Sequence, residues 1–293
     1  MTWQFTLSGF LIGALVVMTG MGGGSLLTPI LVIVFGFKPT LAVGTDILHG
    51  AIFKSFGAVR HRRLGTVHAR LTFWMFLGSG PMSLLGVATA TWLKHHYGGT
   101  ESVEAYAVGT ALVIGGMGLV AKTFIKRGVQ PDDAPFLLER RDRLIAFALG
   151  AVCGFVVGLT SVGSGTFFGL AMLLVYPLTA QKIVGTDILH AAALLWVAGL
   201  GHLLHGNVNL HAMAWLLVGS IPGILLGSQM SIRIPERSLR FAFAFVLVLS
   251  GIKIVGVPQA SLIVVVTLAV GAFALAVYTL RQVFARQIAS ADH

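Results

Sequence analysis

One hexapeptide occurs twice in the sequence and places two ionisable side chains at helical spacing. The string Gly-Thr-Asp-Ile-Leu-His begins at position 44 and again at position 185. Its carboxylate and imidazole, Asp46 with His49 and Asp187 with His190, stand three residues apart and would share one face of a helix. Such pairs could relay a proton, bind a cation, or contribute carboxylate and imidazole ligands to a metal cluster.

A structural interpretation of the same residues stays open. Asp is a preferred N-cap, so Asp46 and Asp187 would cap helices that begin at Ile47 and Ile188. Ionisable groups within a membrane segment are costly, however, so they usually face a cavity and have a function. A metal site is the weakest alternative, because no further ligand is evident nearby. We therefore assign the two Asp/His pairs to coupling and expect neither a metal ion nor a cofactor.

Two glycine-rich strings form the second set of candidates. They read Gly20-Met-Gly-Gly-Gly-Ser25 and Ser161-Val-Gly-Ser-Gly-Thr166, and each precedes a short apolar run. A helix that starts after such a break has unsatisfied N–H groups and the positive end of its dipole, which suits an anion. Alternatively, the glycines only allow close helix packing. The substrate-binding candidates are Gly22, Gly23, Gly24, Ser25, Gly163, Ser164, Gly165 and Thr166, with Thr45 and Thr186 of the hexapeptides.

One lysine departs from the duplicated pattern. Lys54 has Leu195 as its counterpart, and three roles stay open for it. It could attract a substrate anion, pair with Asp46, or extend its ammonium group toward the Arg60 end of the helix. We place Lys54 with the coupling residues. The matched histidines His61 and His202 are expected to be exposed structural residues at helix ends.

The hexapeptides belong to a gapless duplication. The offset of 141 residues (185 − 44) that aligns them also aligns many glycines, one pair of prolines and one pair of tryptophans. The aligned pairs include Gly9/Gly150, Gly13/Gly154, Gly65/Gly206, Trp74/Trp215, Pro81/Pro222 and Gly86/Gly227. We therefore predict transmembrane repeats at 1–124 and 143–257, a cytoplasmic linker at 125–142, and a C-terminal transmembrane helix with a tail at 258–293.

The composition points to a lipid environment. Hydrophobic residues make up 56% of the chain, charged residues 10%, and the mean hydropathy is +0.90. Soluble domains have about 45–50% apolar and about 25% charged residues. The apolar residues here form long uniform runs rather than alternating with polar ones at helical spacing, as in membrane-spanning helices. No nucleotide-binding loop, metalloprotease helix or G-x-S-x-G elbow occurs, so we do not expect an enzyme.

The net charge of +10 could suggest a nucleic acid partner. The Lys and Arg residues, however, lie in short clusters between apolar runs, as in the cytoplasmic loops of membrane proteins. We therefore expect a lipid bilayer and a small anion as partners, and no nucleic acid. Cys153 is the only cysteine, which excludes an intramolecular disulfide.

The positive charges predict that the two repeats are inverted in the membrane. Four arginines lie between positions 60 and 70, whereas the matching stretch 201–211 has no Lys or Arg. Placing 60–70, 122–143, 231–240 and the tail in the cytoplasm is self-consistent and gives each half an odd number of crossings.

The first two apolar runs of each half allow three arrangements: a re-entrant hairpin, two short crossings or one broken helix. We favour the hairpin. The expected fold is an all-α polytopic membrane protein with two inverted repeats. Each repeat has a glycine-broken short-helix pair and three transmembrane helices, and one extra helix follows at the C-terminus.

Several strings carry a family resemblance. They are Gly22-Gly-Gly-Ser-Leu-Leu-Thr-Pro29, Ala42-Val-Gly-Thr45, Gly57-Ala-Val-Arg-His-Arg-Arg63, Leu64-Gly-Thr-Val67, Gly206-Asn-Val208 and Gly219-Ser-Ile-Pro-Gly223. In these strings, and over nearly its whole length, the sequence resembles the sulfite exporter TauE/SafE family of bacterial membrane permeases. In that family the residue after Gly-Thr is often Ser, whereas this chain has Asp46 and Asp187.

The resemblance implies export of sulfite or an organosulfonate across the bacterial inner membrane. Together with the motifs, it leads us to expect an anion permease coupled to protons or to the membrane potential. Two alternatives stay open. The Asp/His motifs could serve a cation or metal carrier, or the chain could be a membrane scaffold that transports nothing.

Overall fold

The structure is a computed structural model and describes residues 2–19, 26–96, 102–124, 136–230 and 236–256. Within these ranges the chain forms helices and no strand, which confirms the predicted all-α fold. The helices are α1 Thr2–Thr19, α2 Leu27–Ile33, α3 Pro39–Arg63, α4 Ala69–His96, α5 Ser102–Phe124, α6 Arg140–Thr160, α7 Phe167–Val175, α8 Ala180–Leu204, α9 Leu210–Met230 and α10 Glu236–Val255.

The duplication is visible in the helix boundaries. Adding the sequence offset to the bounds of α3 gives the bounds of α8 residue for residue. The same offset relates α1 to α6, α2 to α7, α4 to α9 and α5 to α10. Among the described residues, each half thus contains five helices in the same order, of which the second is short.

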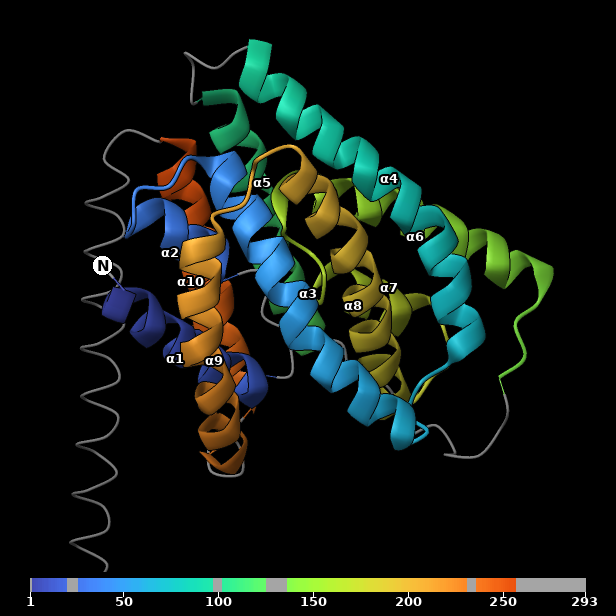
Figure 1. The fold of residues 1–293 in the computed structure, drawn as a ribbon. Helices are drawn as coiled ribbons and strands as arrows, with labels where there is room; N and C mark the ends of the chain where they lie inside the picture. The colour runs from blue at the N-terminus through green and yellow to red at the C-terminus, as the bar shows by residue number, and fades with distance from the viewer. Residues whose placement is uncertain (1, 20–25, 97–101, 125–135, 231–235, 257–293) are drawn as a thin grey trace, which may run out of the picture.

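The two halves exchange helices rather than folding side by side. Helix α1 of the first half packs on α9 of the second, and α6 of the second packs on α4 of the first. The related helices α3 and α8 pack on each other, as do α5 and α10 (Figure 1). Contacts that repeat in this way define a pseudo-twofold relation between the halves.

Matched hydrogen bonds support this relation at the atomic level. The backbone N–H of His68 donates to the Thr186 hydroxyl at 2.9 Å. Its counterpart, the N–H of Asn209, donates to the Thr45 hydroxyl, also at 2.9 Å. Each bond crosses from one half to the other, so the two halves stabilise each other reciprocally.

The central helices α3 and α8 run antiparallel. A Cβ added at Gly57 would lie 3.2 Å from Ile188, and one added at Gly50 would lie 3.1 Å from Leu195. Residue numbers therefore fall along α8 as they rise along α3. A twofold relation that makes equivalent helices antiparallel is compatible with inverted repeats, although the orientation across a membrane stays a prediction.

Matched glycines bring the exchanged helices into backbone contact. A Cβ at Gly154 of α6 would lie 2.5 Å from the Cα atom of Ser79 on α4. Gly13 of α1 has the same relation to Ser220 of α9, where the added Cβ would lie 2.8 Å from Cα. No side chain fits at either crossing, as is common where membrane helices approach closely.

The helices are suited to a membrane. Four of the described helical stretches are long and apolar enough to cross one: Ala69–His96, Ala105–Lys122, Arg140–Thr160 and Ala180–Leu204. Large apolar side chains such as Trp3, Phe73 and Val152 are exposed on the protein surface. Water would not favour such a surface, but lipid would. The chain is therefore a multi-pass membrane protein.

Both short helices return toward the start of the helix that precedes them. In the second half, the Tyr176 hydroxyl, just after α7, donates to the carbonyl oxygen of Asp142 near the start of α6 at 2.9 Å. In the first half, the ring of Phe5 in α1 stacks on that of Phe35 after α2, with centroids 4.5 Å apart. These contacts contradict a single broken helix, and they fit both the hairpin and two crossings. Helix α6 has 21 residues, so only the returning helix of that pair is short.

Some predictions fall outside the described residues. They are the glycine-rich string of the first half with Gly22, Gly23, Gly24 and Ser25, most of the linker at 125–142, and the C-terminal helix at 258–293. They therefore stay predictions from the sequence.

Candidate functional site

The glycine-rich break of the second half is a buried turn between α6 and α7. Ser161 ends α6 in the left-handed conformation with φ of 63°, and Gly163 has φ of 109°. The Gly163 carbonyl oxygen accepts hydrogen bonds from the N–H groups of Gly165, at 2.7 Å, and Phe167, at 3.2 Å. Those two amides are therefore used within the turn and are not available to an anion.

Lys54 of α3 provides a positive charge at this break. Its side chain is 3% exposed, and its ammonium group donates to the carbonyl oxygen of Ser164 and, at 3.0 Å, to the Ser164 hydroxyl. The alternative in which Lys54 extends toward Arg60 is wrong, because its ammonium group is bound inside the protein. A buried cation joins the central helix of the first half to the break of the second.

Thr166 is the N-cap residue of α7, but its side chain makes no capping hydrogen bond. Its hydroxyl is buried and has no hydrogen-bond partner among the described residues. Buried polar atoms are nearly always hydrogen-bonded, so such an atom at a break calls for an explanation. Thr166 was predicted from the sequence to bind substrate, and it stays a candidate for that role.

Asp46 lies inside α3 and links three segments. Its Oδ2 atom accepts hydrogen bonds from the N–H group of Thr28 at 3.2 Å, the Thr28 hydroxyl at 2.6 Å and the Ser161 hydroxyl at 2.9 Å. The N-cap interpretation of Asp46 and Asp187 is wrong, because α3 begins at Pro39 and α8 at Ala180. Sequence reasoning missed Thr28 and Ser161 as partners.

Asp187 has a different environment. Its Oδ1 atom is buried and makes no hydrogen bond within the described part of the chain. Its Oδ2 atom lies near Gly169 of α7, where an added Cβ would be 3.6 Å away. The ammonium nitrogen of Lys122, on α5, lies 2.8 Å from the same Cβ position. Lys122 also could not be identified from the sequence, since nothing in its local sequence relates it to α8.

The two hexapeptide histidines make matched bonds to serines of the other half. His49 Nε2 lies 3.0 Å from the Ser220 hydroxyl, and His190 Nε2 lies 2.9 Å from the Ser79 hydroxyl. Both histidines are buried. These bonds join α3 to α9 and α8 to α4, so each of them connects a helix of one half to a helix of the other.

The hexapeptide threonines also take part in contacts between the halves. Thr45 donates to the carbonyl oxygen of Leu41 and accepts from Asn209, and Thr186 accepts from His68. His202 is fully buried, with Nε2 2.8 Å from the Gly158 carbonyl oxygen, so its expected exposure is wrong. Within the described ranges, no group of three or more His, Cys, Asp or Glu residues could hold a metal ion.

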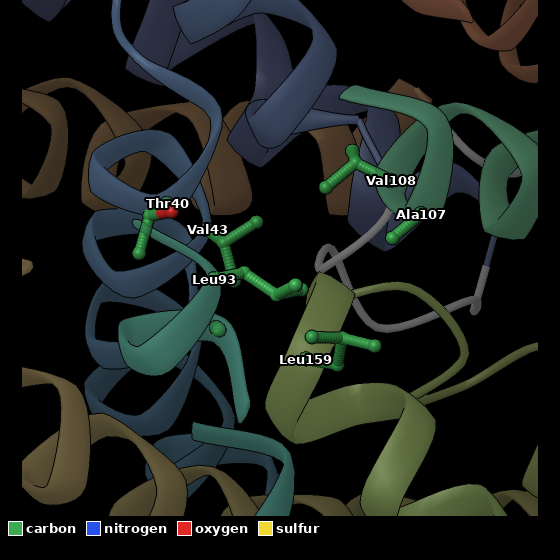
Figure 2. Close-up of a pocket in the computed structure, with 7 residues that line it drawn as sticks. Thr40, Val43, Leu93, Ala107, Val108 and Leu159 are labelled. Atoms are coloured by element: carbon green, nitrogen blue, oxygen red, sulfur yellow. The ribbon is translucent and has the colours of Figure 1, made fainter. Parts of the chain in front are cut away.

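Two cavities elsewhere in the protein are not lined by Lys54, Asp46 or Asp187. One lies between α3, α4, α5 and α6 and is lined by Thr40, Val43, Ala90, Leu93, Ala107, Val108 and Leu159 (Figure 2). Its volume is about 10 Å³, enough for one water molecule at most. A hollow of about 370 Å³ lies between the end of α2 and the end of α10 and contains neither Lys54 nor Asp187.

The fold and this buried cluster define the protein as a polytopic membrane protein with a charged site where its halves meet. The model of the family described as "Sulfite exporter TauE/SafE" matches residues 5–254, and the chain belongs to this family. The family and the relatives below indicate a membrane transporter.

The curated relatives carry the same kind of description. The chain is 37% identical to the "Probable membrane transporter protein YjnA" of Bacillus subtilis (strain 168), over 87% of this chain and all of that protein. Two others from the same organism, YdhB and YunE, have the same description, and each is 22% identical to this chain. The matches cover 83% of this chain and 96% of YdhB, and 84% of this chain and 94% of YunE. No solved structure gives a significant match.

Proposed function

We propose that the protein exports a small sulfur-containing anion, sulfite or an organosulfonate, across the bacterial inner membrane. Lys54, Ser164 and Thr166 bind the anion at the break between α6 and α7. Transport is coupled to protons or to the membrane potential, and the C-terminus lies in the cytoplasm. The family description supports the substrate class, since it names sulfite export.

The observation that carries this proposal is the buried position of Lys54. An ammonium group that is removed from water needs partners, and here it has two oxygens of Ser164 at a break in the helices. A cation held in that way attracts anions and repels cations. This argues against the cation or metal carrier, in which Asp46 and Asp187 would have to bind a positive ion beside Lys54.

The antiparallel contact of α3 with α8 fits a transporter. In inverted-repeat transporters the substrate site lies near the midplane, where the two repeats meet and helices are interrupted. The break at Ser161–Thr166 has this character, because it faces α3 of the other half through Asp46 and Lys54. The two halves can then alternate access to one site.

The proposal is tested by flux into proteoliposomes that contain the purified full chain. Sulfite, a small sulfonate, sulfate and a divalent cation are offered in turn. We expect flux of sulfite or the sulfonate. Lys54→Leu, which introduces the side chain found at the matching position 195, should lower this flux about tenfold or more, as for loss of a charge-assisted hydrogen bond.

Lys38→Leu is the matched control, because it removes the same charge from an exposed position just before α3. It should keep the wild-type flux. Cation movement without anion flux would support the carrier alternative, and no flux of any solute would support the scaffold. Inside-out membrane vesicles that accumulate the anion would establish the outward direction.

A further inference from the structure

The two duplicated aspartates are not equivalent in their surroundings. Three donors from Thr28 and Ser161 converge on Oδ2 of Asp46. The positions that match these donors in the other half are Gly169 and Gly20, which have no hydroxyl group. Asp187 therefore cannot receive the equivalent side-chain hydrogen bonds, and its buried Oδ1 atom has no partner within the described residues.

The space that Thr28 fills beside Asp46 is taken beside Asp187 by a lysine. Gly169 has no side chain, and the ammonium nitrogen of Lys122 occupies the region where one would project. Lys54 and Lys122 are both close enough to Asp187 to interact with its charge. Asp187 thus lies near two cations, one from α3 and one from α5.

Several further groups face this carboxylate from the surrounding helices. Cys153 of α6 lies near enough to sense its charge, and Asp46 of α3 interacts with the same Lys54. Helix α7 offers no ionisable side chain over Phe167–Val175. The contact from the start of α4 is the backbone N–H of His68 with Thr186. His190, on the same helix as Asp187, bonds to Ser79.

A proton on each aspartate has a different consequence. Protonation of Asp46 would weaken three hydrogen bonds to Oδ2 that join α2, α3 and the break. The Oδ1 atom of Asp187 has no hydrogen-bond partner within the described residues, so a proton on that atom breaks no hydrogen bond to them, but it removes the negative charge that two ammonium groups share. Those groups can then bind an anion, and the unpartnered Thr166 hydroxyl lies one turn from Gly169 on α7.

We propose that Asp187 alone carries the coupled proton, and that Lys122 joins Lys54 in binding the substrate anion when Asp187 is neutral. The protein then carries the proton and the anion at the same time, and both cross the membrane together. A dianion that crosses with one proton carries a net charge of −1. Its outward movement is favoured by a membrane potential that is negative inside. This inference rests on the proposed anion transport and adds its coupling mode and a second binding lysine.

The test follows proton movement and anion movement separately in proteoliposomes, with sulfite as the anion and the membrane potential clamped. In the wild type, a sulfite gradient should carry protons in the same direction, measured with a trapped pH dye. Asp187→Asn should lose this proton movement, while exchange of labelled against unlabelled sulfite persists and keeps only the pH dependence of the sulfite–hydrogensulfite equilibrium. Asn keeps the size of Asp but cannot take up a proton.

Asp46→Asn should still move protons with sulfite, although its folded form should be less stable. If that variant does not yield folded protein, Ser161→Ala removes one donor to Asp46 and should also keep proton movement. Lys122→Gln should raise the half-saturating sulfite concentration about tenfold, and Lys122→Arg should restore it.

Two results would overturn the inference and leave anion transport standing. One is proton movement that persists in Asp187→Asn or that disappears equally in Asp46→Asn and Ser161→Ala. The other is proton movement opposite to that of sulfite in the wild type. A wild-type protein that moves no anion at all would instead overturn the proposed function itself, and the coupling with it.

Discussion

The Ser161 hydroxyl donates a 2.9 Å hydrogen bond to Asp46, and the two residues belong to different halves of the duplicated chain. Ser161 is the residue that ends α6 in the left-handed conformation, at the start of the glycine-rich break. Asp46 lies in the central helix α3 and also accepts a hydrogen bond from Thr28 of α2. The break of one half is therefore positioned by the helices of the other.

The membrane orientation of the two halves can be tested with single cysteines in a Cys153→Ser background. Leu64 directly follows α3 and is 62% exposed, and Leu204 is the last residue of the related helix α8 and is 85% exposed. Inverted repeats place these residues on opposite sides, so a membrane-impermeant thiol reagent should label only one of them in intact cells. Equal labelling of both from one side would contradict the inverted arrangement. Asn207, in the loop after α8, is fully buried and would be a poor probe.

Substitution at the helix crossings should destabilise the fold. Gly154→Ala would place a Cβ 2.5 Å from the Ser79 Cα atom, where only a backbone shift can relieve the overlap. We expect a loss of about 1–3 kcal/mol, as for other overpacked sites. The measurement is thermal unfolding of the purified protein in detergent.

Gly80→Ala is the control for this prediction. A Cβ there would meet the Phe76 ring at 3.5 Å, an ordinary contact, so the midpoint should change little. A drop for Gly80→Ala as large as that for Gly154→Ala would show that the loss reflects glycine replacement in α4 and α6 generally and not the crossing.

The break should tolerate replacement at Gly165 better than at Gly163. Gly163 has φ of 109°, which side-chain-bearing residues rarely adopt, so Gly163→Ala strains the turn that holds Ser164 against Lys54. Gly165 does not have a positive φ. We expect sulfite flux to be lost in Gly163→Ala and reduced less in Gly165→Ala, with both proteins folded in the membrane. Wild-type flux in Gly163→Ala would mean that the turn does not position the site.

The His/Ser bonds between the halves should contribute to stability equally on both sides of the pseudo-twofold relation. Ser220→Ala and Ser79→Ala each remove the partner of one buried imidazole, of His49 and His190 respectively. Each should lower the free energy of unfolding by about 0.5–1.5 kcal/mol, the usual net value of such a hydrogen bond.

Chemical unfolding of the two serine variants provides the measurement. If the histidines serve mainly to join helices, sulfite flux in both variants should stay coupled to protons. Uncoupled flux in both would instead assign the coupling role to the histidines, as the sequence alone suggested for His49 and His190.

The membrane class, the helical fold and the duplication were predictable from the sequence, because each depends on local composition or on identity at a fixed offset. Long apolar runs with few charges can satisfy their backbone groups in lipid only as helices. The repeated hexapeptide and the aligned glycines predict two equivalent units, and α3 and α8 indeed share their bounds exactly at that offset. The resemblance to the family was likewise found from the duplication and the motif strings alone.

The environment of each charged residue was decided only by the tertiary structure. Asp46 is bound to a residue 115 positions away, and Lys54 to one 110 positions away. Helices of the two halves are exchanged, so the partners of one motif come from the other copy and no local pattern identifies them. From the sequence, Asp46 and Asp187 were therefore expected to be equivalent, whereas the packing gives Asp46 three hydrogen-bond donors and places Asp187 near two lysines.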